Sequence, residues 1–173
     1  MSSTTHKAAD ARAESSLFVA FMQIADSLGA QAEQVIKGAG LTAAQYNVLR
    51  ILRGAGSDGL ACREIGERMI SRDPDITRLL DRMEKRNLIT RERQSKDRRV
   101  VKAYVTPQGL ELLKTLDRPV NALHKRQFQG IPPVKLKVLA ALLEEIRSQH
   151  AGRIADCNSP GNTIAKSRQK DSK

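Results

Sequence analysis

Apolar residues recur at steps of three and four positions over much of the chain, which is the period of a helix with one buried face. The first such stretch runs from Leu17 to Ile36 and stops at Gly38 and Gly40. We therefore expect a long helix over about residues 15–37.

A second helix is predicted directly after these glycines. Thr42 is a favourable N-cap, and Gln45 three residues later completes a capping box, in which each side chain bonds the other residue's backbone N–H. The apolar positions of this helix continue to Leu52, and the glycine-rich segment 54–59 predicts a turn.

Two further helices are predicted before residue 88. A short one carries Ile65 and Met69 on one face. In the next, Asp73 is the expected N-cap, and Pro74 occupies the first turn, where a missing N–H has no cost. Asn87 predicts the end of that helix, because asparagine tolerates the left-handed conformation of a helix C-terminus.

The helical period is then interrupted by two runs that are rich in β-branched residues. Residues 88–93 and 100–105 flank a polar turn, which is the pattern of a β-hairpin. Thr106 and Pro107 predict the start of a long helix, and Pro119 predicts a kink in it. A last helix follows and is expected to end near residue 149.

This order of elements predicts a mainly α fold with a small β-hairpin wing. Helices three and four are short and joined by a tight turn, and a hairpin directly after such a helix-turn-helix makes a winged helix. The expected organisation is a flexible N-terminus over 1–14, one domain over 15–149 and a disordered basic tail over 150–173. Within the domain we expect a lobe at about 41–106 and helical arms at about 15–37 and 107–149.

The chain of 173 residues carries a formal net charge of +11, and much of it lies in one segment. Residues 82–102 contain nine Lys and Arg against three Asp and Glu. This balance favours an anionic partner, either nucleic acid or a membrane surface. With three Phe, two Tyr and no Trp, the chain is poor in the aromatic platforms on which single-stranded nucleic acid stacks.

Several function classes are disfavoured by what the sequence lacks. No apolar run approaches the ~18 residues of a membrane span, so no membrane partner is expected. Cys62 and Cys157 lie far apart, which excludes a disulfide framework and favours a cytoplasmic setting. Catalytic motifs and metal-ligand spacings are missing, so we expect no enzyme activity, cofactor or metal. Cys62 is expected to be partly buried, with a thiol sensor as the alternative.

The helix-turn-helix and the basic hairpin together suit double-stranded DNA, because the major groove admits one helix whose first turn reaches base edges. The candidate DNA-binding residues on or before the fourth helix are Arg72, Asp75, Thr77, Arg78 and Arg82. Arginine can bind guanine through two hydrogen bonds, threonine can contact a thymine methyl group, and aspartate can accept from a cytosine amino group. At the hairpin, Lys96, Arg98 and Arg99 suit phosphates or the minor groove. Taken alone, the helix also fits an ordinary surface helix with ion pairs such as Asp81 with Lys85.

These pieces resemble the multiple-antibiotic-resistance regulator (MarR) family of bacterial winged-helix transcription factors. The motifs that carry the resemblance are Leu41-Thr-x-x-Gln45, Ile76-Thr-Arg-Leu-Leu-Asp-Arg-Met-Glu-Lys-Arg-Asn-Leu-Ile89, Arg91, Asp97-Arg-Arg99 and Val105-Thr-Pro-Gln-Gly109. The resemblance implies that Arg99 enters the minor groove and that Asp97 orients it. It also implies a homodimer, an inverted-repeat operator, repression, and relief of repression by a small aromatic effector. The chain departs from the family where the acidic Asp73-Pro-Asp75 opens the fourth helix and where Asn87 replaces a usual glycine.

A homodimer is also expected from the apolar stripes of the arms, which are longer than the small lobe can cover. On a monomer they would leave an exposed apolar patch formed by Leu17, Phe21, Ile24, Leu139, Leu142 and Ile146. A second copy is the expected cover, because two-fold dimers are the commonest closed assembly.

The predicted function is therefore a homodimeric DNA-binding transcriptional regulator. The alternative is a winged-helix module that binds RNA or a protein through its basic hairpin. The position of an effector pocket is left open, because Tyr46, Phe18 and Phe21 fit either a pocket lining or core packing.

Overall fold

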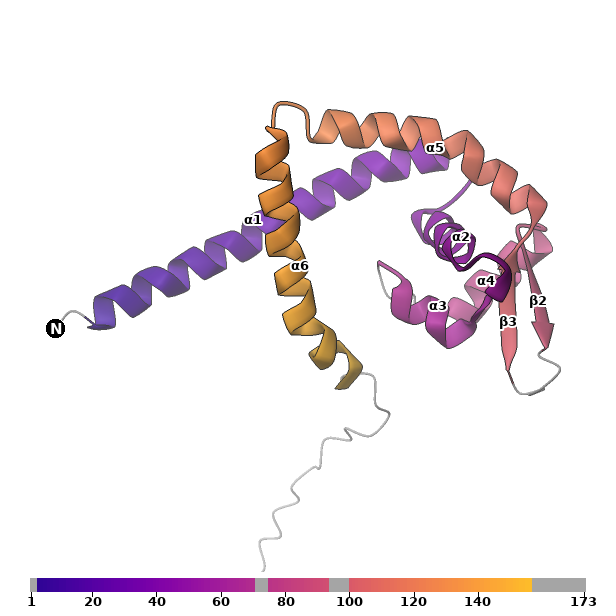
Figure 1. Ribbon diagram of the computed structural model, residues 1–173, viewed down its shortest axis with the longest axis horizontal. Coiled ribbons are helices and arrows are strands. Elements are labelled where there is room, and N and C mark those ends of the chain that lie inside the picture. Colours follow the sequence, from indigo (N-terminus) through magenta and orange to yellow (C-terminus); the bar gives the residue numbers. More distant parts are fainter. Residues whose placement is uncertain (1–2, 71–74, 94–99, 157–173) are drawn as a thin grey trace, which may run out of the picture. The chain divides into compact units, whose positions relative to one another are not determined.

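The computed structural model describes residues 3–70, 75–93 and 100–156. Residues 1–127 form one unit and residues 128–173 a second. The first contains α1 (Ser3–Lys37), α2 (Ala43–Ala55), the short 3-10 helix η1 (Gly56–Asp58), β1 (Leu60–Ala61), α3 (Cys62–Arg68), α4 (Ile76–Lys85), β2 (Ile89–Arg93), β3 (Val101–Val105) and α5 (Pro107–Gln127) (Figure 1). The second contains α6 (Pro133–Asp156).

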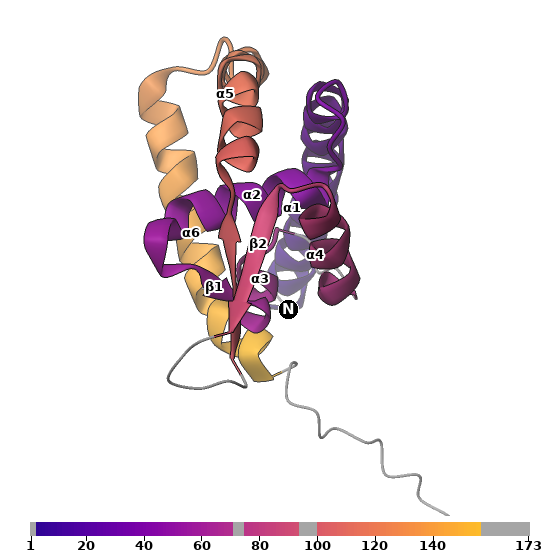
Figure 2. The ribbon, with the colours of Figure 1, turned by 90° about the vertical axis from the view of Figure 1, so that its right-hand side faces the viewer.

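The fold is a winged helix-turn-helix, as the sequence predicts. The helix pair α3 and α4 is followed by the antiparallel strands β2 and β3, which pair in register from Ile89 opposite Val105 to Arg93 opposite Val101. Figure 2 shows the two strands side by side, with α4 next to them. A third strand, β1, was not predicted: Leu60 pairs with Ala103, so that β3 is the central strand of the sheet.

Local capping chemistry sets several of the helix ends at the expected residues. Thr42 accepts from the Gln45 N–H at 3.2 Å, and the Gln45 side chain accepts from the Thr42 N–H at 3.1 Å, which completes the predicted capping box. Asn87 has the expected left-handed backbone, with a φ of 56°. The expectation for α4 was wrong, because its N-cap is Asp75 and not Asp73. Pro74 favours Asp73 in the sequence, because proline suits the first helical position, but it is the Asp75 side chain that accepts from the Arg78 N–H and caps α4.

The outer helices are longer than expected. α1 begins at Ser3, within the segment for which the sequence predicts flexibility, and α6 continues past residue 149 to Asp156. The N-terminal extension contains four alanines, the best helix former, and lengthening an existing helix at either end needs no new nucleus. Pro119 lies inside α5, which continues on both sides of it. Within the described residues, no helix combines the length and the apolar character that crossing a membrane requires.

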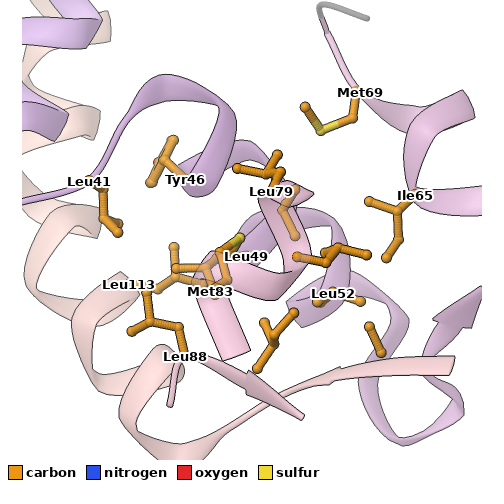
Figure 3. Close-up of a cluster of buried hydrophobic side chains, with 14 of the residues drawn as sticks. Leu41, Tyr46, Leu49, Leu52, Ile65, Met69, Leu79, Met83, Leu88 and Leu113 are labelled. Atoms are coloured by element: carbon orange, nitrogen blue, oxygen red, sulfur yellow. The ribbon is translucent and has the colours of Figure 1, made fainter. Parts of the chain in front are cut away.

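The core of the first unit is shared by the lobe and the two long helices. Figure 3 shows side chains from α2, α3 and α4 meeting Leu88 and Leu113 in one cluster. Ile36 of α1 and Leu116 and Val120 of α5 belong to the same cluster. The helix-turn-helix is therefore anchored on the two long helices by apolar packing and does not form a separate lobe core.

The start of α5 fixes the end of the wing. Thr106 donates from Oγ1 to the Asn87 carbonyl oxygen at 2.7 Å and accepts from the Gly109 N–H at 3.0 Å, so that it caps α5 and ties it to the end of α4. A Cβ atom on Gly109 would lie 2.3 Å from the Leu88 carbonyl oxygen. The Thr-x-x-Gly motif therefore combines a cap with a position where only glycine fits.

Candidate nucleic-acid interface

The two faces of α4 differ in the way the sequence predicts. Leu79, Leu80 and Met83 are buried and hold the helix against the core. On the other side, Thr77, Arg78 and Arg82 are accessible to solvent, and Asp75 is half-buried. A helix that is fixed by its apolar face thus presents one hydroxyl group and two guanidinium groups to solvent.

Asp75 is the N-cap residue directly before α4 and contacts Arg78 twice. Its Oδ1 accepts from the Arg78 backbone N–H at 3.1 Å, which is the N-cap bond. Its Oδ2 lies 3.0 Å from Arg78 Nε. The carboxylate that the sequence offers to a cytosine is therefore engaged by its own helix.

Thr77 lies where α3 and α4 meet. The Cys62 Sγ, near the start of α3, lies 4.0 Å from Thr77 Oγ1. Cys62 is half-buried, as expected from the sequence. This contact joins the first turns of the two helices of the helix-turn-helix.

The wing is joined to α4 by Arg91, for which the sequence alone predicts no partner. Arg91 is a residue of β2, and its Nη2 atom lies 2.6 Å from Asp81 Oδ1 and 2.6 Å from Glu84 Oε2 of α4. The side-chain bonds to Glu84 raise the pKa of Arg91 above its ordinary value, with Asp81 adding to the effect. Under the alternative of an ordinary surface helix, Asp81 would pair with Lys85, whereas in the structure it pairs with this arginine of the neighbouring strand. Arg91 is one of the residues that carry the family resemblance, but its partners are not local in sequence.

The described part of the wing ends with Arg93 opposite Val101. Nearby on β3, Lys102 donates from Nζ to the Asp58 carbonyl oxygen at 3.0 Å, which ties the wing to η1. Five of the predicted DNA-binding residues lie outside the described residues: Arg72, Lys96, Asp97, Arg98 and Arg99.

Comparison with known sequences identifies relatives among transcriptional regulators. The MarR family model matches residues 41–101, which run from just before α2 to the first residue of β3. The transcriptional regulator YkoM of Bacillus subtilis is 32% identical over 114 residues, which cover 64% of this chain and 72% of YkoM. The transcriptional repressor MdtR of the same organism is 43% identical over 70 residues, which cover 40% of this chain and 44% of MdtR.

Solved structures agree with the sequence comparison. A MarR transcription factor from Planctomyces limnophilus is 37% identical, with a TM-score of 0.58 over 75% of this chain and 94% of that protein. CouR from Rhodococcus jostii, solved in complex with p-coumaroyl-CoA, is 25% identical, with a TM-score of 0.66 over 75% of this chain and 90% of CouR. The fold defines a winged helix-turn-helix protein. Together with these similarities, it shows that the chain belongs to the MarR family of transcriptional regulators.

Proposed function

We propose that this regulator is a homodimer that binds an inverted-repeat operator in double-stranded DNA and represses transcription. The observation that carries the proposal is the link between its two basic elements. Arg91 of the wing strand is held by Asp81 and Glu84 of α4, while Thr77 and Arg78 of that helix are accessible to solvent. Helix and wing are thus presented together, as simultaneous contact with a major groove and an adjacent groove requires.

In this proposal α4 enters the major groove. Arg78 contacts a base edge, Thr77 contacts a base or a phosphate, and Arg82 contacts the backbone. The segment beyond Arg93 supplies the second contact, with Arg99 in the minor groove, Asp97 as its support, and Lys96, Arg98 and Arg72 on phosphates. The positive charge of residues 82–102 supports this arrangement, because cations near phosphates release condensed counterions on binding.

Exposed apolar side chains support the homodimer. On α1, Leu17 is 57% exposed, Phe18 is 66% exposed and Ile24 is 58% exposed. On α6, Val134 is 72% exposed and Leu142 is 52% exposed. Apolar stripes of this length are rare on monomers, and a second copy would cover them. Two copies of α4 about one DNA turn apart would read half-sites with centres ~10 bp apart.

A cavity between α1 and α5 supports modulation by a small aromatic ligand. Its volume is about 510 Å³, within the range of pockets that hold small ligands. Leu28, Val35 and Leu123 supply its apolar lining, and Arg126 with three glutamines supplies polar groups. CouR, a relative of the same fold, was solved with p-coumaroyl-CoA bound.

The aromatic residues that the sequence leaves open do not line this cavity. Tyr46 packs in the core, whereas Phe18 and Phe21 are exposed on α1. The ligand site is therefore proposed from the cavity itself and not from an aromatic cluster. Repression is supported by the relative MdtR, which is a repressor.

The proposal is tested by titrating a labelled duplex from the region upstream of the protein's own gene, at several salt concentrations and with unlabelled competitors. We expect a footprint with a dyad and a particle of twice the 19.1 kDa of one chain by light scattering. Arg99→Ala should weaken operator binding by ~1–3 kcal/mol, and Lys96→Ala should flatten the salt slope by roughly one unit. Displacement by RNA but not by operator DNA would favour an RNA-binding module instead.

A further inference from the structure

The contact between Asp75 and Arg78 has a property that isolated surface ion pairs lack: one residue is held by the other at two points. The first carboxylate oxygen accepts from the Arg78 main chain at 3.1 Å, and the second lies 3.0 Å from Nε of the same residue. The N-cap bond therefore orients the carboxylate before the guanidinium reaches it. The short aspartate side chain has no further torsion to order.

The orientation of the carboxylate by the N-cap bond lowers the entropy cost that normally weakens an exposed ion pair. Such pairs contribute little because two flexible side chains must both be ordered. Here only the arginine is still to be ordered, and it lies three residues after Asp75, in the first turn of α4, within reach of the capping carboxylate. The Arg78 side chain nevertheless remains 79% exposed, so it stays accessible to a ligand.

The atom that meets the carboxylate matters for what Arg78 can bind. Because the carboxylate contacts Nε, the edge formed by the two terminal Nη groups can still face a base. The parallel donors of that edge match O6 and N7 of guanine. We infer that Asp75 is a specificity-determining residue that acts through Arg78: it holds the guanidinium in the orientation that reads one guanine in each half-site. This inference rests on the proposed function and concerns how the same interface selects its sequence.

The sign of the charge makes the inference distinct from a simple contribution to affinity. A carboxylate at the DNA-facing end of α4 repels phosphates, so Asp75 should lower the affinity for DNA of any sequence. Excluding water from the interface strengthens its attraction for Arg78 at the same time. Asp75 should therefore lower non-specific binding and raise discrimination, and its removal should reverse both effects.

The test uses the full-length protein and a panel of operator duplexes with single base-pair changes, at one fixed salt concentration. Asp75→Asn and Asp75→Ser both retain an oxygen that caps the helix, so α4 should still form. At the one position per half-site where Arg78→Ala relaxes selectivity, we expect both variants to lose roughly tenfold in discrimination, within the range of a bidentate base contact. Binding to a non-specific duplex should become tighter, and adding Asp75→Asn to Arg78→Ala should cause no further loss of selectivity.

The matched control is Glu144→Gln on α6. Glu144 also pairs with an arginine three residues away, and its substitution removes the same charge, so it should leave discrimination at every position unchanged. A selectivity profile of Asp75→Asn identical to that of the parent overturns the inference. It is also overturned if Asp75→Asn loses discrimination at a cytosine position where Arg78→Ala has no effect, because Asp75 would then contact that base itself. If the parent prefers no duplex, the proposed function itself fails, and the inference fails with it.

Discussion

Arg91 and Glu84 form the contact that joins the wing to α4. The Nε and Nη2 atoms of Arg91 lie 3.0 Å and 2.6 Å from the same oxygen of Glu84, and Nη2 also reaches Asp81. Asp81 and Glu84 are three residues apart and share a helix face, so one guanidinium offsets the repulsion between two carboxylates. The Arg91 side chain is only 26% exposed, which limits solvent screening.

We expect Arg91→Ala to lower the free energy of unfolding by about 1–2 kcal/mol, because it leaves two neighbouring carboxylates without their cation. Arg91→Lys should recover only part of this, since a single ammonium group cannot replace the planar fork. Urea denaturation followed by circular dichroism measures both effects. The control is Arg63→Ala, which removes an exposed pair with Glu67 and should have no measurable effect. Equal effects of Arg91→Ala and Arg63→Ala would contradict the role of the bridge.

Gly109→Ala should destabilise the protein by about 1–3 kcal/mol, because the added methyl group would overlap the Leu88 carbonyl oxygen and force the backbone to shift. The same substitution at Gly66 in α3, where an added Cβ would have no atom within 4 Å, should stabilise by about 0.5–1 kcal/mol. Thermal unfolding of the two variants beside the parent gives the two signs directly. A gain in stability for Gly109→Ala would show that the wing and α5 are not packed as described.

Stability should fall at alkaline pH through Tyr46. Burial raises the pKa of Tyr46 above its ordinary value of 10.0, and the charge of Arg50 acts in the opposite direction. Above that ordinary value the unfolded chain loses the phenolic proton while the folded chain retains it, so the free energy of unfolding decreases as pH rises through this window. Tyr46→Phe should reduce the slope. Melting temperatures measured on either side of the ordinary pKa, compared with the parent, test the sign, and an unchanged slope would argue against the assignment.

A charge in the apolar stripe of α1 or α6 should separate the proposed homodimer without unfolding it. Ile24→Glu and Leu142→Glu place a carboxylate at positions that are 58% and 52% exposed in one chain, so each chain should keep its fold. Light scattering should report the mass of one chain, and operator affinity should drop because half-sites would be bound singly. Thr115→Glu, an exposed position on α5, is the control and should remain a dimer. Variants that stay dimeric would place the interface elsewhere.

The sequence predicts the parts of the structure that depend on neighbours in the chain. Thr42 with Gln45, Thr106 with Pro107, and Asn87 all act within one turn of helix, so their chemistry is visible in the sequence. Leu60 and Ala61 were not recognised as a strand, because two residues carry no alternation and their partners lie on β3, far along the chain.

In the candidate site, too, the sequence predicts what depends on local pattern and misses the contacts between elements. The exposed face of α4 follows from the helical period, which places Leu79, Leu80 and Met83 inward and leaves Arg78 outward. The contacts of Arg91 were not predicted, because they join β2 to α4. From the sequence, Asp75 is a candidate for contact with a base. Its pairing with Arg78 was not predicted, because that pairing requires Asp75 and not Asp73 to be the N-cap of α4.

The central position of β3 also means that the sheet cannot form until this last strand has been synthesised. Both neighbours of this strand, β1 and β2, precede it in the sequence, so neither has a partner until residues 101–105 have left the ribosome. Until then the helix-turn-helix has no sheet to close against, and Leu60 and Ile89 remain available to other strands. During synthesis, β1 and β2 are therefore exposed to pairing with other chains until β3 has been made. A chain that stops before Val101 contains two strands that lack their partner.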